Sequence, residues 1–111
     1  GQLYLQDGMS LNSQILSSEW IEDATSSQIN DWYGYLWWLP GTGYLAVGLG
    51  GQYIAVIPEL DLVIGTHSAT QSSDAYTDQL LSYIYNQIVP IFDLDSRVDN
   101  STLLLEKIHE Y

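Results

Sequence analysis

The chain contains no cysteine and very little positive charge. Among its 111 residues, Arg97 and Lys107 are the two Lys or Arg side chains, against 14 Asp and Glu, and the formal net charge is −12 at pH 7. Without cysteine, disulfides, Cys-ligated zinc and a thiol nucleophile are all excluded. With so few cations, the chain has almost nothing with which to neutralise phosphates or anionic lipid head groups, so we expect neither nucleic acid nor a membrane surface as a partner.

Long apolar runs are also missing. No stretch approaches the roughly 18 residues that a membrane-spanning helix needs. The first residues have neither the basic nor the apolar region of a signal peptide, so a signal peptide would belong to a longer precursor. We expect no metal and no organic cofactor. Asp93, Asp95 and Asp99 superficially suggest a calcium loop, but Arg97 stands at a ligand position and Val98 replaces the turn glycine.

Aromatic side chains, in contrast, are abundant. Hydrophobic residues make up 46% of the chain, which has four Trp and nine Tyr. A disordered segment would be less hydrophobic than this. We therefore expect a folded, aromatic-rich domain.

The first 31 residues read as helices joined by polar loops. Residues 1–7 resemble the last turns of a helix that Gly8 stops. Ser17 or Ser18 can cap a second helix that begins near Glu19, with Trp20, Ile21 and Ala24 forming its apolar stripe. Residues 26–31 are polar and are expected to form a loop.

Residues 32–64 have the texture of β-structure. Short aromatic or β-branched runs are separated by turn signals at residues 40–43, 48–51 and 58–59, a spacing that predicts consecutive antiparallel pairing of about four strands. The expected strands are residues 32–38, 44–47, 52–57 and 60–64.

Helical periodicity returns between residues 72 and 89, and Pro90 is expected to end this helix. Residues 92–111 are expected to form an acidic tail with a short helix over residues 102–110. The predicted fold class is therefore α+β, an antiparallel β-meander with flanking helices, divided into a domain over residues 1–91 and the tail over residues 92–111.

Four segments, in this order and spacing, resemble the class C β-lactamase and esterase branch of the penicillin-recognising serine hydrolases. The resemblance covers residues 1 to about 90 and implies the C-terminal portion of a β-lactamase/transpeptidase-like α/β domain. The segments are Gly1-Gln2-Leu3-Tyr4-Leu5, Tyr33-Gly34-Tyr35-Leu36-Trp37-Trp38, Gly48-Leu49-Gly50-Gly51-Gln52 and Pro58-Glu59-Leu60-Asp61-Leu62-Val63.

Members of this family work with a Ser-x-x-Lys pair, a Tyr-x-Asn or Ser-x-Asn motif, and a Lys-Thr-Gly or His-x-Gly motif on a sheet strand. The chain has no Ser-x-x-Lys, because Leu104 lies three residues before Lys107, and it has no Tyr-x-Asn. The resemblance therefore implies that the nucleophile and its base lie in an upstream part of the protein.

The third family motif maps onto Leu49-Gly50-Gly51, which the resemblance makes a substrate-binding strand. Two glycines there would let a substrate backbone approach closely. Leucine stands where the family has a cationic or polar side chain, which puts activity in doubt. By the same resemblance, the backbone N–H of Gln52 supplies one oxyanion-hole donor.

Three functions from different classes follow. The leading one is the C-terminal fragment of a serine hydrolase that acts on a small amide, lactam or ester. Its partner would be the upstream remainder of the same protein, and family members are often exported to the periplasm. The second is an inactive homologue that serves as a binding or scaffold module, as Leu49 suggests. The third is a carbohydrate binder with exposed Trp and Tyr. We also expect the isolated chain to self-associate.

Two other patterns invite a functional reading. His67, Ser68 and Asp74 suggest a Ser-His-Asp triad, but adjacent residues on an extended chain point apart, so we reject it. Trp37 and Trp38 could form substrate walls. Because neighbouring strand residues point to opposite faces, we expect one in the core and the other under a helix.

Overall fold

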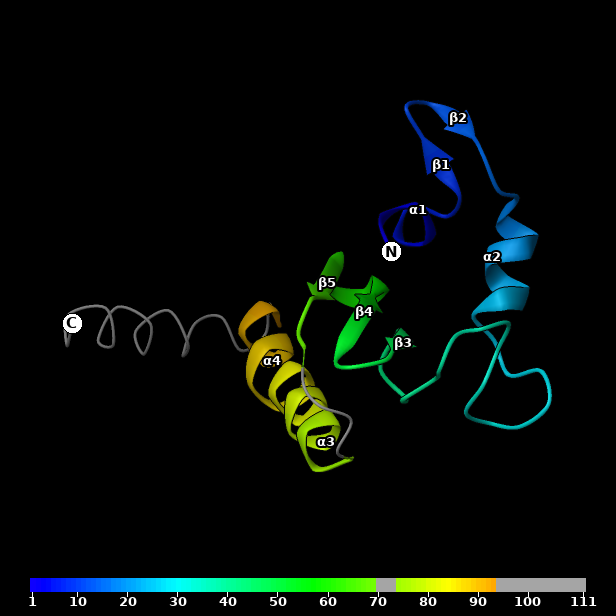
Figure 1. The fold of residues 1–111 in the computed structure, drawn as a ribbon. Helices are drawn as coiled ribbons and strands as arrows, with labels where there is room; N and C mark the ends of the chain where they lie inside the picture. Colours follow the sequence, from blue (N-terminus) through cyan, green and yellow to red (C-terminus); the bar gives the residue numbers. More distant parts are fainter. Residues whose placement is uncertain (70–73, 94–111) are drawn as a thin grey trace, which may run out of the picture.

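The structure is a computed structural model that describes residues 1–69 and 74–93 and confirms the α+β class (Figure 1). The expected tail lies outside these residues apart from Phe92 and Asp93. The helices are α1 (Gln2–Leu5), α2 (Ser18–Ala24), the 3-10 turn η1 (Pro58–Leu60), α3 (Asp74–Tyr83), the π-helical η2 (Ile84–Ile88) and α4 (Val89–Phe92), and the strands are β1 (Met9–Ser10), β2 (Ser13–Gln14), β3 (Tyr44–Gly48), β4 (Gln52–Ile57) and β5 (Leu62–Thr66).

The N-terminal elements follow local sequence signals. After α1 the chain leaves the helix through two residues of positive φ, Asp7 at +51° and Gly8 at +79°, and the Gly8 N–H donates to the Leu3 carbonyl at 2.8 Å. Ser17 is the N-cap of α2, and its hydroxyl accepts a hydrogen bond from the Trp20 N–H at 3.2 Å. Ile21 and Ala24 are buried, while Trp20 is 47% exposed.

The centre of the fold is a three-stranded antiparallel sheet in the order β3-β4-β5. Leu45 pairs with Ala55, which also pairs with Ile64 on the other side. The meander is therefore confirmed for its last three strands. Each is rich in β-branched or aromatic residues, and each connection is short.

The first expected strand, residues 32–38, is corrected by the structure. It forms isolated bridges instead of a regular strand, one from Tyr33 to Trp38 and one from Trp38 to Leu45. The chain turns back on itself, because Leu36 has a φ of +63° and the Gly34 N–H donates to the Trp37 carbonyl. A Cβ on Gly34 would lie 2.2 Å from the Ala24 carbonyl oxygen, so the backbone packs directly on the end of α2.

The prediction that Pro90 ends the long helix is wrong. Helical structure continues from α3 through η2 and α4 to Phe92. Proline cannot donate the usual bond, and its ring clashes with the carbonyl four residues back. The π segment just before Pro90 changes the spacing of the backbone hydrogen bonds, since the Val89 N–H donates to the Ile84 carbonyl five residues back. The helix therefore continues past Pro90.

The sheet is covered on both faces, by the helix of α3, η2 and α4 on one side and by α1 on the other (Figure 1). On the first face, Tyr53 and Ile57 pack against Ile84. On the second, Trp37 and Tyr44 form one cluster, with the Tyr4 ring 4.9 Å from that of Trp37. The aromatic residues of the sequence therefore build the junction between α1 and the sheet.

Candidate functional site at the β3–β4 turn

Leu49, Gly50 and Gly51 form the turn that connects β3 to β4. The last pair of the ladder, Gly48 with Gln52, closes it. The turn expected at residues 48–51 is therefore confirmed, whereas the strand that the family resemblance implies for Leu49-Gly50-Gly51 is corrected. Gly50 and Gly51 have φ values of +76° and +82°, a region that glycine occupies at little cost, so the turn itself requires them.

Hydroxyl groups from the end of β5 hold the carbonyls of this turn. Thr66 Oγ1 donates to the Gly51 carbonyl at 2.9 Å and accepts from the Tyr53 N–H at 3.0 Å. Ser68 Oγ lies 2.8 Å from the Gly50 carbonyl oxygen and 3.1 Å from that of Gly51. Two neighbouring hydroxyls thereby fix the orientation of two successive peptide groups.

This arrangement also sets the direction of the Gln52 N–H. In a trans peptide, the N–H points opposite to the C=O of the same unit. Because the Gly51 carbonyl points toward Thr66 and Ser68, the Gln52 N–H points away from them and toward β3, where Gly48 is its partner in the ladder. Leu45 exchanges both of its backbone hydrogen bonds with Trp38, so Gly48 and Gln52 form a hydrogen-bonded pair of the β3–β4 ladder and the Gln52 N–H is engaged by the Gly48 carbonyl.

The side chains around the turn are apolar or neutral. Leu49 is 84% exposed, and the Gln52 side chain is also exposed. Neither Lys nor Arg occurs in residues 1–93. The described part of the chain therefore offers no Lys or Arg to bind a carboxylate near this turn.

The hydroxyl of Ser68 hydrogen-bonds the backbone of the β3–β4 turn and is not placed as the nucleophile of a triad. It is directed at the carbonyls of Gly50 and Gly51. His67 is exposed, and the side chain of Asp74 lies outside the described residues. The geometry of Ser68 thus agrees with the rejection of the triad.

Trp37 and Trp38 lie in different environments, as their neighbouring positions in the chain predicted: Trp37 lies in the core and Trp38 at the surface. Trp37 is buried against Tyr4 and Tyr44, whereas Trp38 is 41% exposed and stacks on Trp32 with ring centroids 5.3 Å apart. Trp38 lines a groove beside α3. Sequence reasoning missed Trp32, although the five aromatic residues within residues 32–38 were a signal for it.

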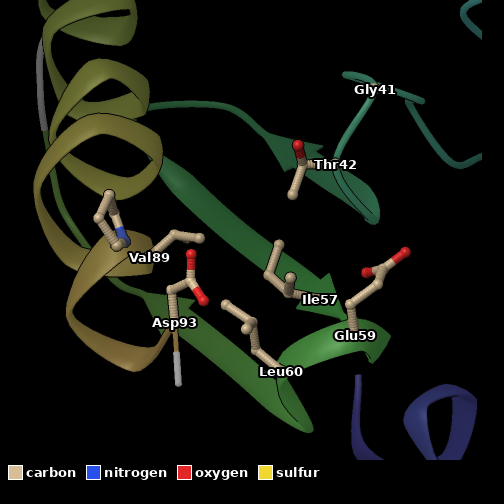
Figure 2. A pocket seen from close by; sticks show the side chains of 8 residues that line it. Gly41, Thr42, Ile57, Glu59, Leu60, Val89 and Asp93 are labelled. Carbon is tan, nitrogen blue, oxygen red and sulfur yellow. The ribbon is translucent and has the colours of Figure 1, made fainter. Parts of the chain in front are cut away.

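A second hollow lies at the other end of the long helix (Figure 2). It has a volume of about 540 Å³ and brings together the Gly41–Thr42 turn, the end of β4 and the start of α4. Ile57 and Val89 form its apolar wall, and the carboxylate of Glu59 lies at its rim. No sequence motif indicated this hollow, because its walls come from three separate segments.

Two tyrosines of the core have altered acidity. Burial, followed by the negative groups of Tyr4, Asp7 and Glu59, raises the pKa of Tyr44 to about 12. Burial alone raises the pKa of Tyr85. Among the described residues, no partner accepts or donates a hydrogen bond at the Tyr85 hydroxyl.

Residues 1–69 and 74–93 lack two other kinds of feature. They contain no group of three or more His, Asp or Glu placed to hold a metal ion. None of their helices has the length and hydrophobicity needed to cross a membrane. Of the calcium-loop residues, only Asp93 falls within this range.

In comparisons with known proteins, no family model and no curated protein matches the chain.

Proposed function

We propose that the chain is the C-terminal part of a β-lactamase-like serine hydrolase domain. It contributes the antiparallel sheet and the β3–β4 turn, and an upstream segment contributes the nucleophile. One observation carries the proposal. Three of the four segments that resemble the family meet in one core cluster through Tyr4, Trp37 and Val63, and the fourth is the turn between β3 and β4 of the same sheet.

The proposed chemistry is acyl transfer from a small amide, lactam or ester to serine. Attack on the carbonyl places negative charge on its oxygen. The resemblance assigns one donor for that charge to the Gln52 N–H, which reaches a substrate only when it is released from the Gly48 carbonyl. One such donor contributes about 2.7–4 kcal/mol in a serine hydrolase. With Leu49 beside the turn, the preferred substrate has no carboxylate at this position.

A second candidate is an inactive homologue that serves as a binding or scaffold module. The specific observation in its favour is Leu49, which is 84% exposed at the position of the family's cationic or polar side chain. An aliphatic side chain there can neither raise the local potential nor bind a substrate carboxylate.

Covalent labelling separates the two candidates. A longer protein that carries this chain is incubated with a fluorophosphonate or a penicillin, with the 111-residue chain as the control, and both are followed by intact mass. The proposal requires an adduct on the longer protein alone. No adduct on either, together with no turnover of an activated ester, favours the inactive homologue.

A charge substitution tests the role of the turn itself. In the longer protein, Leu49→Lys is expected to raise kcat/KM for a carboxylate-bearing ester relative to its neutral analogue. Ile29→Lys is the matched control, because Ile29 is 90% exposed and the change in net charge is the same. An equal effect of both variants would remove the turn from the proposed site.

A further inference from the structure

A groove of about 520 Å³ lies between α3, strand β3 and the segment of residues 32–40 that precedes it. Its volume is in the range of small-molecule sites, which run from about 300 to 1,000 Å³. Its walls come from the 32–40 segment, from β3 and from α3, and none of them belongs to the β3–β4 turn. The lining residues are Trp32, Trp38, Leu39, Pro40, Leu45, Val47, Asp78 and Leu81.

Two stacked indole rings form one wall of this groove. The ring centroids of Trp32 and Trp38 are 5.3 Å apart, with an interplanar angle of 22°. Their side chains are 53% and 41% exposed. Tyr33 meets Trp38 edge-on at 5.1 Å and supports it. Indole faces attract cations, and Trp is the most effective aromatic residue for this interaction.

The charge around the groove favours the same kind of ligand. Among the described residues that line it, Asp78 is the one with a charge; the net charge of the chain is −12, and residues 1–93 contain neither Lys nor Arg. A cation is attracted over a long range, and an anion is repelled. A neutral sugar needs several hydrogen-bond partners, and the described lining side chains offer the Asp78 carboxylate and two indole N–H groups.

We propose that this groove binds a small organic cation with an apolar body, such as an aryl- or alkyl-trimethylammonium compound. The charged group lies against the exposed faces of Trp32 and Trp38 and near the Asp78 carboxylate, and the apolar body covers Val47 and Leu81. This binding site goes beyond the proposed acyl transfer and does not depend on it.

The test is a titration of the 111-residue chain with benzyltrimethylammonium, followed by tryptophan fluorescence and calorimetry. We expect saturable binding that weakens as salt is added. Trp32→Leu and Asp78→Asn are each expected to weaken binding by about 5-fold or more, as loss of a partly desolvated cation–π or charge contact predicts. Both residues are exposed, and circular dichroism checks that each variant is folded.

Trp20→Leu is the matched control. Trp20 is also exposed and stacks on Tyr35 at 5.6 Å, but it lies outside the groove, so its loss leaves the affinity unchanged. A second control compares choline with 3,3-dimethylbutan-1-ol, which has carbon in place of the charged nitrogen. The proposal is overturned if choline and 3,3-dimethylbutan-1-ol bind equally well, or if Trp20→Leu loses as much affinity as Trp32→Leu. It is also overturned if methyl glucoside binds saturably and the cation does not bind.

Discussion

Single residues of this protein act through backbone geometry more than through charge. Gly50 and Gly51 form the β3–β4 turn with positive φ values. Two hydroxyl side chains, Thr66 and Ser68, then hold the carbonyls of that turn. The candidate oxyanion donor thus depends on glycines and hydroxyls that a search for charged catalytic residues would pass over.

Gly41 and Gly43 allow a clean test of steric crowding in the loop before β3. Both have positive φ, at +91° and +63°, so alanine costs about 1–2 kcal/mol of strain at either. A Cβ at Gly43 would also lie 2.0 Å from the Val56 carbonyl oxygen, whereas at Gly41 nothing lies within 4 Å. We expect Gly43→Ala to lose about 1–3 kcal/mol more than Gly41→Ala in urea unfolding. Equal losses would contradict this.

The stability of the protein should fall in alkaline solution because of Tyr44. Its pKa rises from 10.0 to about 12 on folding, so the folded state holds this proton more tightly than the unfolded state. The contribution is fully present below about pH 10 and is lost as the pH rises to about 12. Thermal unfolding of the wild type and of Tyr44→Phe between pH 9 and 12 measures it. The variant should lose less stability over that interval, and an identical slope would refute the assignment.

At the scale of elements, the long C-terminal helix depends on a change in its own geometry. The π segment η2 lets α3 and α4 run as one helical body past Pro90. The same segment places Ile84, which has no exposed surface, against the sheet. The irregular turn therefore both accommodates the proline and supplies a core residue.

Ile84→Ala is expected to cost about 2–5 kcal/mol in chemical denaturation, because it removes buried methylene groups and leaves a cavity. The matched control is Ile29→Ala. Ile29 is 90% exposed, so its truncation should change the free energy of unfolding by no more than about 0.5 kcal/mol. Similar costs for the two variants would mean that the helix does not pack on the sheet as described.

At the scale of the whole molecule, a high negative charge is combined with a large exposed apolar surface. Trp32, Trp38, Val47 and Leu49 are all at least 41% exposed. An exposed apolar surface of this kind usually marks a site that another protein segment covers or that a ligand occupies. The proposed upstream segment would cover part of it, and the groove beside α3 would bind a cation.

The isolated chain is therefore expected to self-associate, and more strongly at high salt. Added salt screens the repulsion between copies with a net charge of −12, while the apolar attraction remains. Sedimentation at micromolar concentration, with and without salt, measures the association, and binding of an apolar dye reports the exposed surface. A monomer that binds no dye under both conditions would contradict this expectation.

Local sequence signals were sufficient for much of the fold. The Ser17 cap, the helix end near Asp7 and Gly8 and the three strands β3, β4 and β5 were predictable, because each depends on residues that are neighbours in the chain. The β1–β2 hairpin had no such signal, since its strands have two residues each and its turn is Leu11-Asn12.

Features that depend on distant residues appeared only in three dimensions. The 32–38 run reads as a strand, but contact with the end of α2 turns its backbone. The alternation of Trp37 and Trp38 indicated opposite sides, yet the stacking of Trp38 on Trp32 and the groove beside α3 required the packed structure. Propensity and turn chemistry act between sequence neighbours, whereas a groove and the direction of a peptide group are set by contacts between segments far apart in the chain.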